Sequence, residues 1–228
     1  MQLKKPHFQP NKIANCIVIG GMIALGKTTI ANTLANHIQA AKVVCELETN
    51  DQLVELLLAK MYERSDELLY SPLFQLYFTL NRFGKYQNNC NTINPTIFDR
   101  SIFEDWLFAK HNIIRPAVFS YYNQLWNRLA KELVNKHGVP NLYVILDGDW
   151  KLFEKRLFMR NRKVEIDNFT KNQLYFQNLH RVYTGFMEAV CNDFGINYCI
   201  IDAKLPIVTI IKMILEKLKL QKLDWKFI

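Results

Sequence analysis

A glycine-rich segment at residues 21–28 has the residue types and the spacing of a phosphate-binding loop. It reads Gly-Met-Ile-Ala-Leu-Gly-Lys-Thr and fits the pattern G-x-x-x-x-G-K-[ST]. Glycines let the backbone turn its N–H groups toward phosphate oxygens, and the amino end of a following helix attracts anions. In such a loop Lys27 reaches the β- and γ-phosphates, and the Thr28 hydroxyl binds Mg²⁺. The predicted ATP site consists of Gly21, Met22, Ile23, Ala24, Leu25, Gly26, Lys27, Thr28 and Thr29.

The surroundings of this loop favour a nucleotide site over a plain turn. An apolar run at 16–19 precedes the loop, and a helical pattern begins at residue 26. A glycine turn that merely connects a strand to a helix is the alternative, and these flanks argue against it. The sequence has no Asn-Lys-x-Asp signature, which argues against a GTPase. We therefore expect a phosphotransferase that uses ATP and Mg²⁺.

Short apolar runs between longer helical patterns predict the fold that positions this loop. Each run is rich in β-branched or aromatic residues and apolar throughout, which is typical of parallel strands covered on both faces. The segments between them have apolar residues at spacings of three and four, which predicts helices. We expect an α/β fold of the P-loop NTPase type, with three α/β/α layers and a five-stranded parallel sheet. The predicted strands are 16–19, 43–45, 96–98, 142–146 and 198–201, and the predicted helices are 26–39, 51–62, 66–87, 101–112, 117–136, 150–162, 170–193 and 206–220.

Length and composition favour a single globular domain over residues 1–228. Half of the 228 residues are hydrophobic, and the formal net charge is +8. The positive charge favours anionic partners such as nucleotides, but no run of five or six basic residues indicates a nucleic-acid arm. The five cysteines show no Cys-x-x-Cys spacing, so neither a disulfide framework nor a zinc site is indicated. No apolar stretch is long enough to span a membrane, and we expect a soluble, cytoplasmic protein.

Beyond the loop, several spaced motifs resemble the deoxyribonucleoside kinase family, from about residue 17 to about residue 207. The loop Gly-Met-Ile-Ala-Leu-Gly-Lys-Thr-Thr is similar to the family's Gly-Asn-Ile-Ala/Gly-x-Gly-Lys-Ser-Thr. The family places Glu-Pro-Val after the second strand, with its glutamate nineteen residues past the loop lysine. Here Glu46-Leu-Glu48 begins nineteen residues after Lys27. The resemblance implies that Glu46 contacts the nucleoside 5′-hydroxyl as general base. Because the proline is missing, Glu48 stays an alternative.

A second motif, Phe74-Gln75-Leu-Tyr-Phe-Thr-Leu-Asn-Arg82, is similar to the family's Phe-Gln-x-Tyr-x-x-x-x-Arg helix. Gln75 and Arg82 are seven residues apart, or two helical turns, so one helix face presents both. The resemblance implies that Gln75 binds the base edge, Phe74 stacks on the base and Arg82 lies deeper in the pocket. In the family, an arginine–aspartate pair such as Arg82 and Asp105 accompanies acceptance of deoxyadenosine, deoxyguanosine or deoxycytidine. Phe78 stands where some deoxyadenosine-type members have a bulky residue, which favours a purine substrate.

The segment Asp99-Arg100-Ser101 ends the predicted third strand and resembles the family's Asp/Glu-Arg-Ser. The resemblance implies that Asp99 serves Mg²⁺ or takes part in proton transfer. It places Arg100 between the 5′-oxygen and the transferring phosphate. Glu46 and Asp99 could each be the base, and we prefer Glu46.

The segment Arg156-Leu-Phe-Met-Arg160-Asn-Arg162 matches the family's lid, Arg-x-x-x-Arg-x-Arg, so we expect a lid at about 156–168. Guanidinium groups bind phosphate bidentately and neutralise charge on the transferring group, which suits a role at ATP. Glu165 takes the place of the lid acid that meets the nucleoside. A solvated basic helix end is the plainer alternative, and the other motifs outweigh it.

Two further positions match less closely. Tyr62 lies near the place of a family tyrosine that contacts the sugar 3′-hydroxyl, although a tyrosine on a helix surface is an equally simple interpretation. Asp202 lies in the segment where the family holds the adenine of ATP.

The motifs together predict ATP-dependent 5′-phosphorylation of deoxynucleosides, with purines preferred. One rival is a nucleoside monophosphate kinase such as a thymidylate kinase, whose acceptor phosphate the Glu46 carboxylate would repel. A second rival is a non-catalytic module that binds nucleotides or nucleic acid, which would leave Glu46, Gln75 and Asp105 without a joint purpose. Family members are commonly homodimers, and the apolar segment 117–127 could form the contact, although core packing explains it equally well.

Overall fold

The computed structural model describes residues 12–47, 51–221 and 225–228. Its centre is a parallel sheet in the order β2-β3-β1-β4-β5, which confirms the predicted five-stranded sheet. The inner strands of the sheet are almost fully buried. All residues of β3 are buried, and in β4 all but the last. This burial on both faces explains why the runs are apolar rather than alternating. The strands are β1 (Ile13–Gly21), β2 (Lys42–Val44), β3 (Thr96–Asp99), β4 (Val139–Asp147) and β5 (Tyr198–Asp202).

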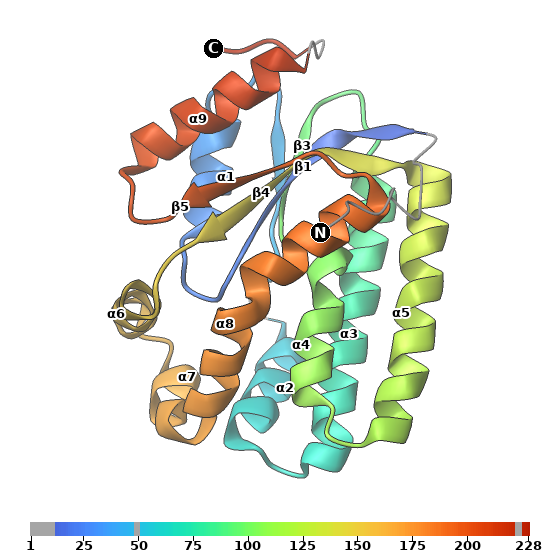
Figure 1. The fold of residues 1–228 in the computed structure, drawn as a ribbon, viewed down its shortest axis with the longest axis vertical. Coiled ribbons are helices and arrows are strands. Elements are labelled where there is room, and N and C mark those ends of the chain that lie inside the picture. Colours follow the sequence, from blue (N-terminus) through green and yellow to red (C-terminus); the bar gives the residue numbers. More distant parts are fainter. Residues whose placement is uncertain (1–11, 48–50, 222–224) are drawn as a thin grey trace, which may run out of the picture.

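Helices cover both faces of the sheet. In Figure 1, α1 and α9 lie on one side of the strands, while α3, α4, α5 and α8 lie on the other. In the same view α2 and α7 lie below the sheet, near the bottom, and α6 lies at the left. The helices are α1 (Lys27–Ala35), α2 (Gln52–Glu63), α3 (Glu67–Asn89), α4 (Asp105–Asn112), α5 (Pro116–His137), α6 (Trp150–Arg160), α7 (Lys163–Asp167), α8 (Phe169–Phe194) and α9 (Ile207–Leu220).

Apart from shifts at the ends of elements, two predicted elements differ from the structure. The helix predicted at 101–112 is divided into a 3₁₀ turn (Ile102–Glu104) and α4, because Ser101 has extended backbone and its hydroxyl accepts a hydrogen bond from Phe103 N. The lid contains the separate five-residue helix α7, which the pattern of apolar residues did not predict.

All strands are parallel, so their carboxyl ends meet at one edge of the sheet. Ile19 of β1 lies opposite Asp99 of β3, and Gly21 lies opposite Leu146 of β4. The loops that follow β1, β2 and β3 therefore converge at this edge.

Two glycines at the end of β1 are required by close packing. A Cβ on Gly20 would lie 2.5 Å from the ring of Tyr143, and one on Gly21 would lie 2.9 Å from the Leu146 side chain. Gly21 also has φ of +149°. The strand can therefore lead into the loop only with small residues at these positions.

The last residues of the chain are fastened to the opposite edge of the sheet. The Trp225 indole is 9% exposed and its Nε1 donates a hydrogen bond to Asn15 Oδ1 at 2.6 Å. Backbone hydrogen bonds join Gln39 N to Lys226 O (2.8 Å) and Ile228 N to His37 O (3.0 Å). We call residues 225–228 the C-terminal strap, because they tie the end of the chain to the segment that follows α1.

No helix within residues 12–47, 51–221 and 225–228 is both long and apolar enough to cross a membrane.

Candidate active site

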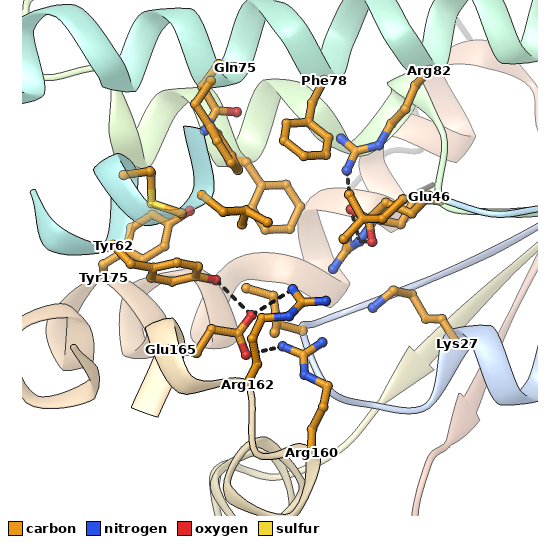
Figure 2. Close-up of a pocket in the computed structure, with 17 residues that line it drawn as sticks. Lys27, Glu46, Tyr62, Gln75, Phe78, Arg82, Arg160, Arg162, Glu165 and Tyr175 are labelled. Atoms are coloured by element: carbon orange, nitrogen blue, oxygen red, sulfur yellow. Dashed lines mark hydrogen bonds and ion pairs between the residues drawn. The ribbon is translucent and has the colours of Figure 1, made fainter. Parts of the chain in front are cut away.

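A cavity of about 70 Å³ lies at the carboxyl edge of the sheet, between the phosphate loop, α3 and the segment predicted as a lid. Figure 2 shows Gln75, Phe78 and Arg82 entering it from α3, with Lys27 and Glu46 on one side and the lid residues opposite α3. Its lining includes most of the predicted catalytic and substrate residues: Lys27, Glu46, Tyr62, Phe74, Gln75, Arg82, Arg100, Arg160, Arg162 and Glu165.

The phosphate loop has the backbone that the motif predicts. Ala24 and Gly26 have positive φ, of 62° and 92°, and α1 begins directly after Gly26. Lys27 is 6% exposed, and its Nζ donates to Met22 O at 2.9 Å, so the ammonium group lies over the loop. Burial and the positive charge of Arg100 lower the pKa of Lys27 to about 8. An anion in the loop would favour the charged form of this lysine and raise its pKa.

Arg156 braces the loop from α6. Its guanidinium donates to Leu25 O at 2.8 Å and to Ala203 O at 2.7 Å. Arg156 therefore joins the phosphate loop to the segment that follows β5. Asp202, at the end of β5, is exposed, and its carboxylate accepts from Lys204 N at 2.8 Å outside the cavity.

Thr28 and Asp99 lie together, as a magnesium site requires. The Thr28 hydroxyl donates a hydrogen bond to Asp99 Oδ2, and Asp99 Oδ1 is buried without a partner among the described residues. Burial raises the pKa of Asp99, opposed by the charge of Lys27. An orphaned carboxylate oxygen next to a hydroxyl fits Mg²⁺, which takes few protein ligands and completes its shell with water and phosphate. No group of three or more His, Cys, Asp or Glu ligands occurs in the part of the chain that the structure describes.

Glu46 lies between two arginines. Arg82 donates to Glu46 Oε1, and Arg100 Nε lies 3.1 Å from the same oxygen. Arg82 also pairs with Asp105, which is 1% exposed, so the predicted arginine–aspartate pair is present. Burial raises the pKa of Glu46, but the charges of Arg100, Arg82 and Lys27 outweigh this and lower it to about 2. Glu46 is therefore a carboxylate at any physiological pH. Glu48, the alternative base, lies outside the described residues.

The segment that carries Glu46 is held against α3 by a lysine. Lys85 Nζ donates to Cys45 O at 3.0 Å and to Glu46 O at 3.2 Å. This lysine stabilises a stretch in which the family's proline is missing. The Cys45 side chain is exposed, whereas Cys16, Cys90 and Cys191 are buried and Cys199 is half-buried.

An aromatic wall and an amide face the upper part of the cavity. Phe74 and Phe78 lie with ring centroids 4.6 Å apart, and the Arg82 guanidinium lies 5.0 Å from the Phe78 centroid. Gln75 is 2% exposed, and its Nε2 has no hydrogen-bond partner among the residues described here. A buried amide donor without a partner is costly, so this position suits a ligand that accepts a hydrogen bond.

The segment predicted as a lid converges on a single buried carboxylate. Glu165 is 1% exposed, accepts from Arg160 and Arg162 (3.2 Å to Arg162), and receives the Tyr62 hydroxyl at 3.4 Å (Figure 2). The Tyr62 side chain is buried and lines the cavity rather than lying on a helix surface, and its predicted contact with the sugar 3′-hydroxyl stays a prediction.

Sequence reasoning missed several residues that line or support the site. Leu58, Met61, Phe108 and Tyr175 complete the cavity wall, and Glu104 lies behind Arg100. Leu58, Met61 and Phe108 have no local signature, because apolar positions of a helix look the same whether they face a core or a pocket. Tyr175 resembles a position in the family's helix after the lid, and we interpreted it as core packing. Glu104 had a weak signal, since it is four residues from Arg100 and could pair with it.

Comparison with known proteins agrees with this geometry. The family model described as deoxynucleoside kinase matches residues 17–224. An uncharacterised protein of Mycoplasma pneumoniae is 66% identical over 224 residues, covering 98% of each chain. The deoxyadenosine/deoxycytidine kinase of Bacillus subtilis is 24% identical over 202 residues, covering 86% of this chain and 83% of that protein. The solved structure of deoxyadenosine kinase from M. mycoides with bound dCTP has the same fold, with a TM-score of 0.71 and 22% identity over 90% of this chain and 98% of that one.

Proposed function

The chain belongs to the deoxynucleoside kinase family and is a kinase, and we propose that it transfers the γ-phosphoryl group of ATP to the 5′-hydroxyl of a purine deoxynucleoside. The products are the deoxynucleoside 5′-monophosphate and ADP. The chain would act in nucleotide salvage, with deoxyadenosine or deoxyguanosine as the acceptor.

One observation carries this proposal: the Glu46 carboxylate faces the same cavity as Lys27 and the unpartnered Gln75 amide. A carboxylate suits a neutral hydroxyl acceptor. The negative charge of Glu46 would repel an acceptor phosphate. Arg82 and Arg100 could not offset this repulsion, because both are already paired with carboxylates. The arrangement therefore supports a nucleoside rather than a nucleoside monophosphate as acceptor.

Phosphoryl transfer depends mainly on positioning and on neutralising charge. Lys27 and the backbone of residues 21–28 hold the phosphates of the donor, and Glu46 accepts the proton of the 5′-hydroxyl. Arg100 lies between Glu46 and the loop, where its charge stabilises the transferring group. When bound by Thr28 and Asp99, Mg²⁺ neutralises charge on the phosphates. Arg160 and Arg162 supply further positive charge from the lid.

The base preference follows from the upper wall of the cavity. Gln75 and the Arg82–Asp105 pair offer donors and acceptors to a base edge, and Phe74 and Phe78 offer flat apolar surface. The relative from Bacillus subtilis is named for deoxyadenosine and deoxycytidine, and the structural neighbour for deoxyadenosine. We place deoxyadenosine first among the substrates.

The decisive experiment measures ADP formation from Mg·ATP by the purified protein, with each deoxynucleoside and each monophosphate offered in turn. We expect turnover with deoxyadenosine or deoxyguanosine. Glu46→Gln should lower kcat by about 10²- to 10⁴-fold, because the proton acceptor is lost. Glu55→Gln, the same change at an exposed position of α2, is the matched control and should leave kcat unchanged. Activity on monophosphates alone would overturn the proposal.

We also propose that the chain forms one kinase domain that works as a homodimer. A groove beside α5 and α8 is lined by the aromatic residues Trp106, Trp126, Phe186 and Phe194, and a second copy is the partner that we propose for it. Light scattering should then give twice the chain mass of 26.9 kDa. A mass of one chain at micromolar concentration would contradict the dimer.

A further inference from the structure

Glu104 is a fully buried carboxylate behind the cavity, and the predicted machinery does not include it. Its exposed fraction is 0%, and it lies in the 3₁₀ turn between β3 and α4. A buried carboxylate is costly unless it is paired and hydrogen-bonded, and Glu104 meets both conditions. Three side chains donate to it: the Arg100 guanidinium, the Tyr143 hydroxyl at 3.0 Å and the Tyr183 hydroxyl at 2.7 Å.

The first of these contacts reaches the acceptor side of the site. Arg100 donates through Nη1 to Glu104 and through Nε to Glu46 (3.2 Å), so the guanidinium lies between a buried carboxylate and the one that faces the cavity. The Arg100 guanidinium also lies 4.9 Å from the ring centroid of Phe108. Its backbone has φ of +70°, an uncommon conformation for a residue other than glycine. Glu104 thus fixes the arginine from the side that substrate does not reach.

The tyrosine contacts reach the donor side. The Tyr183 hydroxyl, which donates to Glu104, also accepts a hydrogen bond from Gly21 N at 2.6 Å. The Tyr143 ring packs directly on Gly20, where a Cβ would lie 2.5 Å from it. Both tyrosines that hold Glu104 therefore touch the residues from which the phosphate loop begins.

From these contacts we propose that Glu104 is a positioning residue for phosphoryl transfer, which fixes the Arg100 guanidinium and the start of the phosphate loop relative to each other. The chain of contacts runs from Gly21 N through Tyr183 and Glu104 to Arg100. It couples the element that holds the donor to the arginine beside the acceptor. This inference rests on the proposed kinase function, and it extends the site to Glu104 and Tyr183.

A purely structural role, in which Glu104 only neutralises Arg100, makes a different prediction. Arg100 already has a second carboxylate in Glu46, and neutralisation does not require a hydroxyl that also binds Gly21 N. Under a structural role, loss of the Tyr183 hydroxyl would lower stability without a selective effect on ATP. Under the proposed role, it would change ATP binding.

The test compares steady-state constants of Glu104→Gln, Tyr183→Phe and the wild type for both substrates. Glu104→Gln keeps the shape and removes the charge, and we expect kcat to fall about 10- to 100-fold because Arg100 shifts. Tyr183→Phe keeps the Glu104–Arg100 pair but leaves Gly21 N without its acceptor. We expect its KM for Mg·ATP to rise about 10-fold, with the KM for the deoxynucleoside unchanged.

Tyr86→Phe is the matched control. The Tyr86 hydroxyl is also fully buried and donates to Gly138 O at 3.0 Å, at the amino end of β4, on the edge opposite the site. The Tyr86→Phe variant should lose stability, as Tyr183→Phe does, but it should keep the wild-type KM for ATP. Equal constants in Tyr183→Phe and Tyr86→Phe would overturn the proposal.

Two further results separate this inference from the proposed function. If Glu104→Gln fails to fold, Tyr183→Phe alone tests the proposal, because this variant retains the charges of Glu104 and Arg100. If the wild type phosphorylates no deoxynucleoside, the proposed function fails. Calorimetric ATP dissociation constants of Tyr183→Phe and Tyr86→Phe still test the link to the loop: weaker binding in Tyr183→Phe alone supports it, and equal binding refutes it.

Discussion

At the scale of single residues, the site combines a carboxylate whose pKa is lowered to about 2 with a lysine whose pKa is lowered to about 8. Arginines lower the pKa of Glu46 to about 2, which makes it a weak base in terms of driving force. A loose phosphoryl-transfer transition state tolerates this, because the acceptor hydroxyl need not lose its proton early. In the reaction that we propose, Glu46 first orients the hydroxyl and receives the proton late.

The lowered pKa of Lys27 predicts that ATP binding takes up protons at alkaline pH. Its pKa of about 8 in the free protein lies below the ordinary value of 10.5, so at pH 8.5 most of these side chains are neutral. Phosphates in the loop favour the charged form and raise the pKa, so ATP binding should take up protons at pH 8.5 and hardly any at pH 6.5. Calorimetry of ATP binding in buffers of different ionisation enthalpy measures this uptake. Binding without uptake at pH 8.5 would show that Lys27 is already charged.

Specificity also rests on single residues. Asp105 is 1% exposed and holds Arg82, which in turn holds Glu46. Asp105→Asn removes the charge that positions Arg82, and we expect kcat/KM for deoxyadenosine to fall about 10-fold or more. Competition assays with pairs of deoxynucleosides measure the change. The idea fails if Asp105→Asn keeps the wild-type constants for every base.

At the scale of elements, the lid is a short helix fastened by one acid. Glu165 of α7 holds both Arg160 and Arg162, and these arginines are about one third exposed. Glu165→Gln should loosen this segment, because Glu165 is the buried carboxylate that holds both arginines. Trypsin should then cut after Arg160 and Arg162 at least about tenfold faster.

Asp167→Asn is the control for the lid experiment. Asp167 lies on the same helix and pairs with Lys163, but both side chains are well exposed. Such surface pairs contribute little, so this variant should be cut at the wild-type rate. Equal cleavage of the two variants would show that Glu165 does not fasten the lid.

The elements also show what the sequence could predict. The sheet was predictable because strands buried on both faces are continuous apolar runs, such as 16–19 and 142–146. The ends of β1 and β4 were not predictable, because Gly20, Gly21 and Pro140 are poor strand formers. These residues belong to the strands only because the two strands pair and pack there. Motifs identified Lys27, Glu46 and Gln75 because their spacing is local. Glu104 and Tyr183 are 79 residues apart, so only the folded chain brings them together.

At the scale of the whole molecule, the two edges of the sheet have different tasks. The carboxyl edge carries the cavity, and the amino edge carries the C-terminal strap, for which the sequence suggested no role. The strap joins the layer formed by α1 and α9, because Phe227 forms an antiparallel β-bridge with Ile38, which follows α1. Its contribution should therefore be to stability and not to catalysis.

Trp225 tests this separation. Trp225→Ala removes a nearly buried indole and should lower the free energy of unfolding by about 3 kcal/mol. Trp225→Phe keeps most of the apolar surface, loses the bond to Asn15, and should lose about 1 kcal/mol. Urea denaturation measures both values. Because the site lies at the other edge, kcat of both folded variants should match the wild type, and a large loss of kcat would contradict the division of tasks.

The exposed thiol of Cys45 gives this enzyme a chemical handle beside its own cleft. Its neighbour Glu46 lines the cavity, while Cys16, Cys90 and Cys191 are buried. A thiol-reactive fluorophore would therefore attach first at Cys45, one residue from the acceptor site, and its emission would report the arrival of substrate in real time. The same geometry suits tethering screens, in which fragments captured by Cys45 lie at the mouth of the cavity that Glu46 lines.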